Sequence, residues 1–125
     1  MMKPRDSAVK AKRFEVAEKA RKIASLEGTI RDFEMMAADL ARQIANEEDR
    51  TGIRDQAHFA YSTFAKAAAQ RRANLLTSVA DLKDKLALAK SDHADAALAL
   101  KRLEPAAEER DRLQSKGVSR IVASG

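Results

Sequence analysis

The chain has no cysteine and no tryptophan, and it has only two prolines among its 125 residues. The lack of cysteine excludes disulfide bonds, zinc–thiolate sites and thiol chemistry, and it is compatible with a reducing, cytoplasmic compartment. The prolines are Pro4 and Pro105, so the 100 residues between them contain no ring that would interrupt a helix. Aromatic side chains are few, with four phenylalanines and one tyrosine. These absences disfavour a large globular core and permit long helices.

Long hydrophobic runs are also missing. No stretch approaches the roughly 18 uncharged apolar residues that a membrane-spanning helix needs. The first residues are not followed by an apolar run, so they predict no secretory signal. We therefore expect a cytoplasmic protein.

The apolar side chains that are present are mostly small. Alanine accounts for 26 residues, while valine, isoleucine, leucine and phenylalanine together number only 25. Alanine, glutamate, lysine, leucine and arginine make up 70 residues, a composition typical of long helices and coiled coils. The composition thus predicts a single all-α domain.

The net charge of +5 is confined to one end of the sequence. Residues 1–22 carry eight basic and three acidic side chains, whereas the other 103 residues carry 16 of each. This distribution indicates a local contact with an anionic partner rather than a general coat for nucleic acid.

Seam residues recur every seven positions in the first predicted helix, about residues 6–50. One row is Val9, Val16, Ile23, Ile30, Ala37 and Ile44, and the row three positions later is Lys12, Lys19, Leu26, Phe33, Leu40 and Glu47. The second row is polar at both ends. We therefore expect the seam near the chain termini to be weak and to fray.

A turn follows at about residues 51–58, or as far as residue 62. Gly52 is suited to the left-handed residue that ends a helix, and Asp55 and Ser62 are alternative N-caps for the next helix. The second helix should run to about Glu104, where Pro105 would end or kink it. Residues 105–125 are expected to form a short helix or a flexible tail.

The second helix has its own heptad rows. They are Ala65, Arg72, Val79, Leu86, His93 and Leu100, and Tyr61, Ala68, Leu75, Leu82, Ala89, Ala96 and Leu103. Two long helices with a short connection predict an antiparallel coiled-coil hairpin, a rod two helices wide. Paired positions would sum to 105, which opposes Leu26 to Val79, or to 112 if the loop is longer, which opposes Leu26 to Leu86. The pattern does not choose between these registers.

No pattern in the sequence supports catalysis. The two histidines are interpreted as a turn residue, His58, and a polar seam residue, His93. No recognised metal, phosphate-loop or nucleophile motif is present, so we expect no enzyme activity, cofactor or metal. Four apolar residues fall away from the seam (Phe14, Met35, Leu88 and Leu98), where they are either scattered surface residues or contacts for another protein.

Three stretches of the chain resemble the bacterial flagellar export protein family FliJ, in the form found in alphaproteobacteria. They are MKPRDS with KRFEV and EKARK within residues 2–22, MAADLARQI at 36–44, and HFAYSTFAKAAAQRRANL at 58–75. The resemblance covers roughly residues 2–104. It implies an antiparallel coiled coil similar to the central stalk of a rotary ATPase.

The same resemblance implies a cytoplasmic component of the type III export apparatus at the inner membrane. Members of the family are thought to insert into the export ATPase ring, to contact the cytoplasmic domain of the export gate and to assist export chaperones. By this analogy, the ATPase contact would involve Lys10, Lys12, Arg13, Phe14, Lys19 and Lys22. The gate contact would involve the region 58–72, including Phe59, Tyr61, Arg71 and Arg72.

Other readings remain open. The chain could be a generic coiled-coil adaptor or the equivalent stalk protein of an injectisome. A small basic nucleic-acid-binding protein fits less well, because the other 103 residues are neutral. Two hairpins could also pair into a four-helix bundle that buries the off-seam apolar residues.

Overall fold

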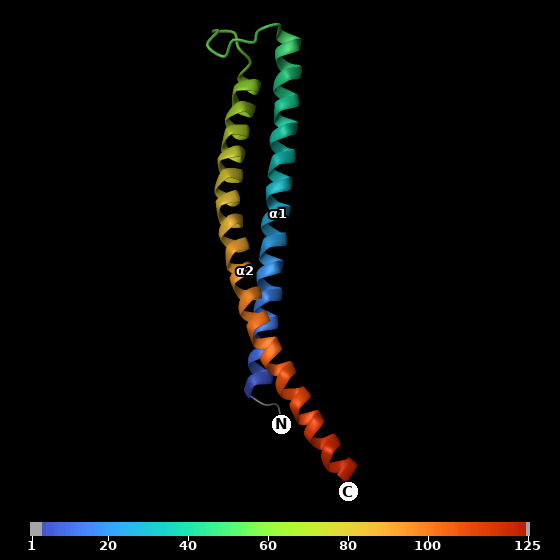
Figure 1. The fold of residues 1–125 in the computed structure, drawn as a ribbon. Helices are drawn as coiled ribbons and strands as arrows, with labels where there is room; N and C mark the ends of the chain where they lie inside the picture. Colours follow the sequence, from blue (N-terminus) through green and yellow to red (C-terminus); the bar gives the residue numbers. More distant parts are fainter. Residues whose placement is uncertain (1–3, 125) are drawn as a thin grey trace. The chain divides into compact units, whose positions relative to one another are not determined.

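The computed structural model is an all-α helical hairpin. It describes residues 4–124, with side chains described for residues 4–104, 112 and 113; residues 1–3 of the basic segment and residue 125 of the tail lie outside. Helix α1 spans Pro4–Thr51 and helix α2 spans Thr63–Ser124, and residues 4–124 contain no strand (Figure 1). The predicted fold class is confirmed.

The hairpin divides into two units that are described separately. Unit 1 comprises residues 1–22 and 89–125, and unit 2 comprises residues 23–88, including the loop. In unit 2, the end of α1 and the start of α2 lie side by side and are joined by the loop (Figure 1).

Helix α1 has clear start and stop signals. It begins at Pro4, whose fixed φ suits a first helical turn, and Asp6 places a carboxylate near the positive end of the helix dipole. It ends before Gly52, which adopts a φ of 74° and donates its N–H to the Glu48 carbonyl at 2.8 Å. Gly52 is therefore the left-handed helix terminator that the sequence predicted.

The loop is the longer of the two predicted alternatives and runs to residue 62. Asp55 does not cap α2, because its Oδ1 accepts from the Ala57 N–H (2.9 Å) and so closes a tight turn. Ser62 is the cap: its Oγ accepts from the Ala65 N–H at 3.2 Å, and its carbonyl accepts from the Lys66 N–H at 3.0 Å. The second candidate from the sequence is thus the correct one.

Helix α2 differs from expectation at its C-terminal end. The sequence predicted that Pro105 would end or kink the helix at Glu104; the helix does not end there but continues through Pro105 to Ser124. A proline removes one helical hydrogen bond and crowds the preceding turn, but its φ of about −65° is itself helical. The helix can therefore continue through a proline, at a cost in stability. The rule that a proline ends a helix overstates that cost here.

The heptad seam is confirmed in both units. Every predicted seam position on the two helices is buried or half-buried, except Arg72. The buried residues of unit 2 are Ile30, Ala37, Leu40, Tyr61, Ala65, Ala68 and Val79, and those of unit 1 are Val9, Ala89 and Ala96. Arg72 is exposed because its long side chain carries the guanidinium out of the seam.

Contacts across the seam decide between the two registers. In unit 1, Arg13 Nε donates to Glu104 Oε1 at 2.9 Å. A pair sum of 112 places Arg13 level with residue 99, five residues or about 7.5 Å along α2 from Glu104, which a long arginine side chain can span. A pair sum of 105 would place it level with residue 92, twelve residues or about 18 Å away, which is too far for this hydrogen bond. In unit 2, Met36 and Leu40 line one opening together with Leu75, as the sum of 112 requires.

Candidate functional site

The predicted ATPase-contacting residues of unit 1 fall into two groups. Lys12 and Lys19 are half-buried at the seam, whereas Lys10, Arg13, Phe14 and Lys22 are exposed. The structure therefore does not place all six on one accessible surface.

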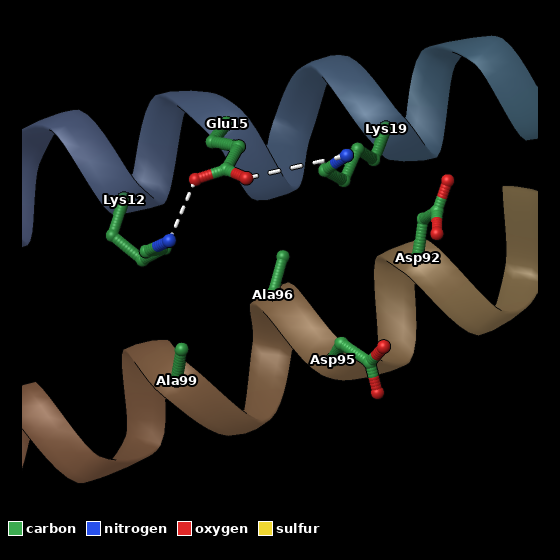
Figure 2. Close-up of a pocket in the computed structure, with 7 residues that line it drawn as sticks. All are labelled: Lys12, Glu15, Lys19, Asp92, Asp95, Ala96 and Ala99. Carbon is green, nitrogen blue, oxygen red and sulfur yellow. Dashed lines mark hydrogen bonds and ion pairs between the residues drawn. The ribbon is translucent and has the colours of Figure 1, made fainter.

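Lys12 and Lys19 lie in a cleft between the two helices (Figure 2). Both bind Glu15, with Nζ–Oε distances of 2.7 Å from Lys12 and 4.0 Å from Lys19. The hydrogen bond from Lys12 lowers the pKa of Glu15, and the positive charges of both lysines contribute to this shift. The two lysines are thus partly neutralised within the unit.

Helix α2 adds further negative charge to this cleft. Its wall consists of Asp92, Asp95, Ala96 and Ala99, and the cleft has a volume of about 260 Å³. Asp92 extends toward α1, while Asp95 points away from it (Figure 2). Two carboxylates, Glu15 and Asp92, therefore face the two ammonium groups, so the cleft itself is not a basic site.

The exposed basic residues of α1 in unit 1 are distributed around the helix, away from the seam. Lys10 and Lys22 are exposed and form no ion pair with the described side chains. Arg13 is exposed although it binds Glu104, and the Phe14 side chain is 65% exposed beside it. These four residues can reach a partner without opening the seam.

The two units differ in charge. From the sequence, unit 1 carries 15 basic and nine acidic side chains, and unit 2 carries nine basic and ten acidic ones. The net charges are therefore +6 and −1. This difference locates the anion-attracting part of the chain in unit 1.

In unit 2, Tyr61 is part of the seam. Only 8% of the residue is exposed, and its Oη donates to Glu48 Oε2 at 2.8 Å. This hydrogen bond, together with desolvation, raises the pKa of Tyr61. A residue held in this way contributes to the fold rather than to an exposed contact.

Glu47 forms a second link between α1 and the loop. Its carboxylate accepts hydrogen bonds from Arg50 at 2.6 and 3.2 Å and from Ser62 Oγ at 2.9 Å. These hydrogen bonds lower the pKa of Glu47, and the one from Arg50 has the larger effect. This cluster was not predicted from the sequence, although the polar Glu47 at the end of the α1 seam was a signal for it.

The other gate-contacting candidates are exposed. Phe59 is 97% exposed at the loop, and its ring stacks on His58. Arg71 lies beside the opening lined by Met36, Leu40 and Leu75, and Arg72 lines a different opening with Ala41, Ile44 and Glu48. Phe59, Arg71 and Arg72 can therefore meet a partner from outside.

The off-seam apolar residues predicted from the heptads are all exposed. They are Phe14, Met35, Leu88 and Leu98, and the structure adds Met36, Phe64 and Leu76 to the exposed apolar residues. His93 is half-buried at the seam, as its heptad position indicates.

The described residues lack two other kinds of site, a metal site and a membrane span. These residues contain no group of three or more histidine or acidic side chains that could hold a metal ion. No helix in this part of the chain has the length and apolar content needed to cross a bilayer. Comparison with known protein families, curated proteins and solved structures finds no match for the chain.

Proposed function

We propose that this protein is a cytoplasmic component of the bacterial flagellar export apparatus. It would act as a coiled-coil stalk that links the export ATPase ring to the export gate and assists export chaperones. One observation carries the proposal: an antiparallel hairpin with a continuous heptad seam contains a FliJ-like stretch, residues 58–75, that heptads alone do not demand. Its association with the inner membrane would be peripheral, through the export complex.

The ATPase contact is assigned to α1 in unit 1. Lys10, Arg13 and Lys22 are exposed cations on this stretch of α1, and Phe14 is an exposed aromatic residue next to Arg13 in the chain. Cations at the rim of an interface speed association and fix orientation, while an exposed aromatic ring supplies apolar contact area. Lys12 and Lys19 would add to this contact only if the partner displaced Glu15.

The test is simultaneous charge reversal of Lys10, Arg13 and Lys22 to glutamate. We expect co-purification of the ATPase and stimulation of ATP hydrolysis to fall by roughly tenfold, as for loss of electrostatic steering. The matched control reverses Arg31, Lys83 and Lys85, three exposed cations of unit 2. Unchanged co-purification and stimulation in the first variant would contradict the assignment.

The gate contact is assigned to the loop side of unit 2. Phe59 and Arg71 carry it, because both are exposed. Tyr61 supports the loop from the seam through Glu48, so its substitution would test folding as well as binding. Alanine at Phe59 and Arg71 should weaken binding to the gate's cytoplasmic domain, and intact binding would contradict the assignment.

Two alternatives make different predictions. A generic adaptor or injectisome stalk would co-purify with other partners and not with the flagellar ATPase. A nucleic-acid-binding protein would bind DNA with an affinity that falls steeply with salt.

A further inference from the structure

The loop of unit 2 presents one aromatic ring to solvent. Phe59 is 97% exposed, the highest exposure among the large apolar residues of the described chain. A flexible loop could fold such a ring back onto the helices, so its exposure needs a cause in the loop itself.

Two consecutive turns fix the loop backbone. In the first, the His58 N–H donates to the Asp55 carbonyl at 3.0 Å, and Asp55 Oδ1 accepts from Ala57. In the second, the Tyr61 N–H donates to the His58 carbonyl at 3.0 Å, and His58 Nδ1 accepts from the Ala60 N–H at 2.9 Å. Phe59 therefore occupies the second residue of a four-residue turn, where its side chain points outward.

His58 also holds the Phe59 ring directly. The two rings stack with centroids 4.7 Å apart and planes inclined by 22°. One imidazole thus closes the turn through a nitrogen and supports the phenyl ring through its face. This arrangement limits both the backbone and the side-chain freedom of Phe59 before any partner binds.

Both ends of the loop are tied to α1. Gly52 ends the helix with its hydrogen bond to Glu48, and Tyr61 and Ser62 donate to Glu48 and Glu47. An ordered loop loses less conformational entropy when it binds, which raises affinity without new contacts. The Phe59 ring is therefore already ordered in the free protein.

The surroundings of Phe59 indicate what would receive it. The loop and the end of α1 hold Asp55, Glu47 and Glu48, whereas the start of α2, residues 63–80, contains no carboxylate but includes three exposed cations, Lys66, Arg71 and Arg72. A single protruding ring needs an apolar pocket, and the three cations favour acidic groups on the part of the partner that faces α2. An anionic membrane fits less well, because interfacial binding requires a broad apolar face rather than one ring.

We propose that Phe59 is a preorganised anchor, positioned by His58, that inserts into an apolar pocket on an acidic surface of the export gate's cytoplasmic domain. The identity of the gate as the partner rests on the proposed function. The anchor and its positioning residue follow from the loop geometry.

The experiment measures binding of the full chain to the gate's cytoplasmic domain by calorimetry. Phe59→Ala should weaken binding at least tenfold, as expected for an interface hot spot. His58→Ala should weaken it several-fold, and His58→Asn should recover part of the loss, because asparagine can still accept from the Ala60 N–H. The matched control is Met35→Ala, which truncates an exposed apolar residue of α1 and should change affinity less than twofold.

A second readout separates positioning from general stability. In the wild-type chain, the stacked imidazole should shift the Phe59 ring protons in NMR spectra, and this shift should be lost in His58→Ala while the thermal melt stays similar. Phe59→Ala binding within twofold of wild type, or unchanged affinity in His58→Ala, would overturn the inference and leave the proposed function standing. A wild-type chain that fails to bind the gate would overturn both. If the chain binds phosphatidylglycerol vesicles and this binding depends on Phe59, the proposal that Phe59 inserts into a pocket on a protein is overturned.

Discussion

At the scale of single residues, the loop side of unit 2 depends on two adjacent carboxylates. Glu48 accepts a hydrogen bond from the Tyr61 hydroxyl, and Glu47 accepts hydrogen bonds from Arg50 and Ser62. These hydrogen bonds connect the last turn of α1 to the start of α2. All of these hydrogen bonds use a carboxylate as the acceptor, and protonation of Glu47 would weaken those that it accepts from Arg50 and Ser62.

Glu47 gives the sharpest prediction at this scale. Its pKa in the folded protein is lowered from its ordinary value of 4.5 by hydrogen bonds from Arg50 and Ser62. Its stabilising contribution is therefore present above about pH 4.5 and is lost as the pH falls through the lower, folded-state pKa. We expect Glu47→Gln to melt at a lower temperature than wild type at pH 7, and the difference to shrink toward pH 3.

Thermal melts followed by circular dichroism at several pH values would measure this effect. Glu34→Gln is the control, because Glu34 is an exposed carboxylate without an ion pair among the described side chains. A constant difference between wild type and Glu47→Gln over the whole range would contradict the assignment of the pH effect to Glu47.

At the scale of the helices, two features were left open by the sequence: the residue at which α2 starts and the register in which α2 pairs with α1. The sequence offered two caps and two registers. The structure selects Ser62 and a pair sum of about 112. Each choice has a test that compares the selected residue with the rejected one.

For the cap, Ser62→Ala should cost about 1 kcal/mol of stability, the usual effect of losing an N-cap hydroxyl. Asp55→Ala should cost less, because Asp55 closes only a local turn in the loop. Urea denaturation of both variants measures the difference. A larger loss from Asp55→Ala than from Ser62→Ala would place the start of α2 at the earlier residue.

For the register, the chain's lack of cysteine makes disulfide trapping clean. Cysteines at positions 37 and 75 should crosslink on mild oxidation, because these positions oppose each other in the register of 112. Cysteines at 37 and 68, which the register of 105 would pair, should crosslink poorly, since a shift of seven residues is about 10 Å along a helix. Gel mobility under non-reducing conditions reports the result, and efficient crosslinking of only the second pair would reverse the register.

At the scale of the whole molecule, the two units use different seams. Unit 2 buries Ile30, Leu40 and Val79, whereas unit 1 buries Val9 and two alanines and places Lys12 and Lys19 at its seam. Less apolar area is therefore removed from water in unit 1, and its helices gain less from pairing. We expect the units to differ in local stability.

Hydrogen exchange tests this difference. Amides of α2 in residues 89–104 should exchange faster than those near Val79. Replacing Lys12 and Lys19 by leucine should slow exchange in residues 89–104, because each half-buried leucine adds about 1–2 kcal/mol of apolar burial. The same replacements at the exposed Lys10 and Lys22 should not slow it, and equal slowing by both pairs would contradict a specific role for the seam.

The sequence by itself determined the elements of this protein. The seven-residue spacing identified the buried and half-buried seam positions, with Arg72 as the one exception, and Gly52 identified the end of α1, because both follow from the local geometry of a helix. The resemblance at residues 58–75 and the charge of residues 1–22 supplied the proposed partners. Of the two outcomes predicted at Pro105, an end of the helix was wrong, because the φ of proline is itself compatible with a helix.

Only the tertiary structure decided what depends on contacts between distant residues. The hydrogen bond between Arg13 and Glu104 selects the register. Lys12 and Lys19 lie in a cleft with Glu15 instead of on the outer surface. The Tyr61 hydroxyl is hydrogen-bonded to Glu48. The structure also showed that the exposed Phe59 ring stacks on His58. A heptad repeat is nearly unchanged by a shift of seven residues, so its periodicity cannot fix the pairing; the hydrogen bonds and ion pairs beside the seam distinguish the two pairings.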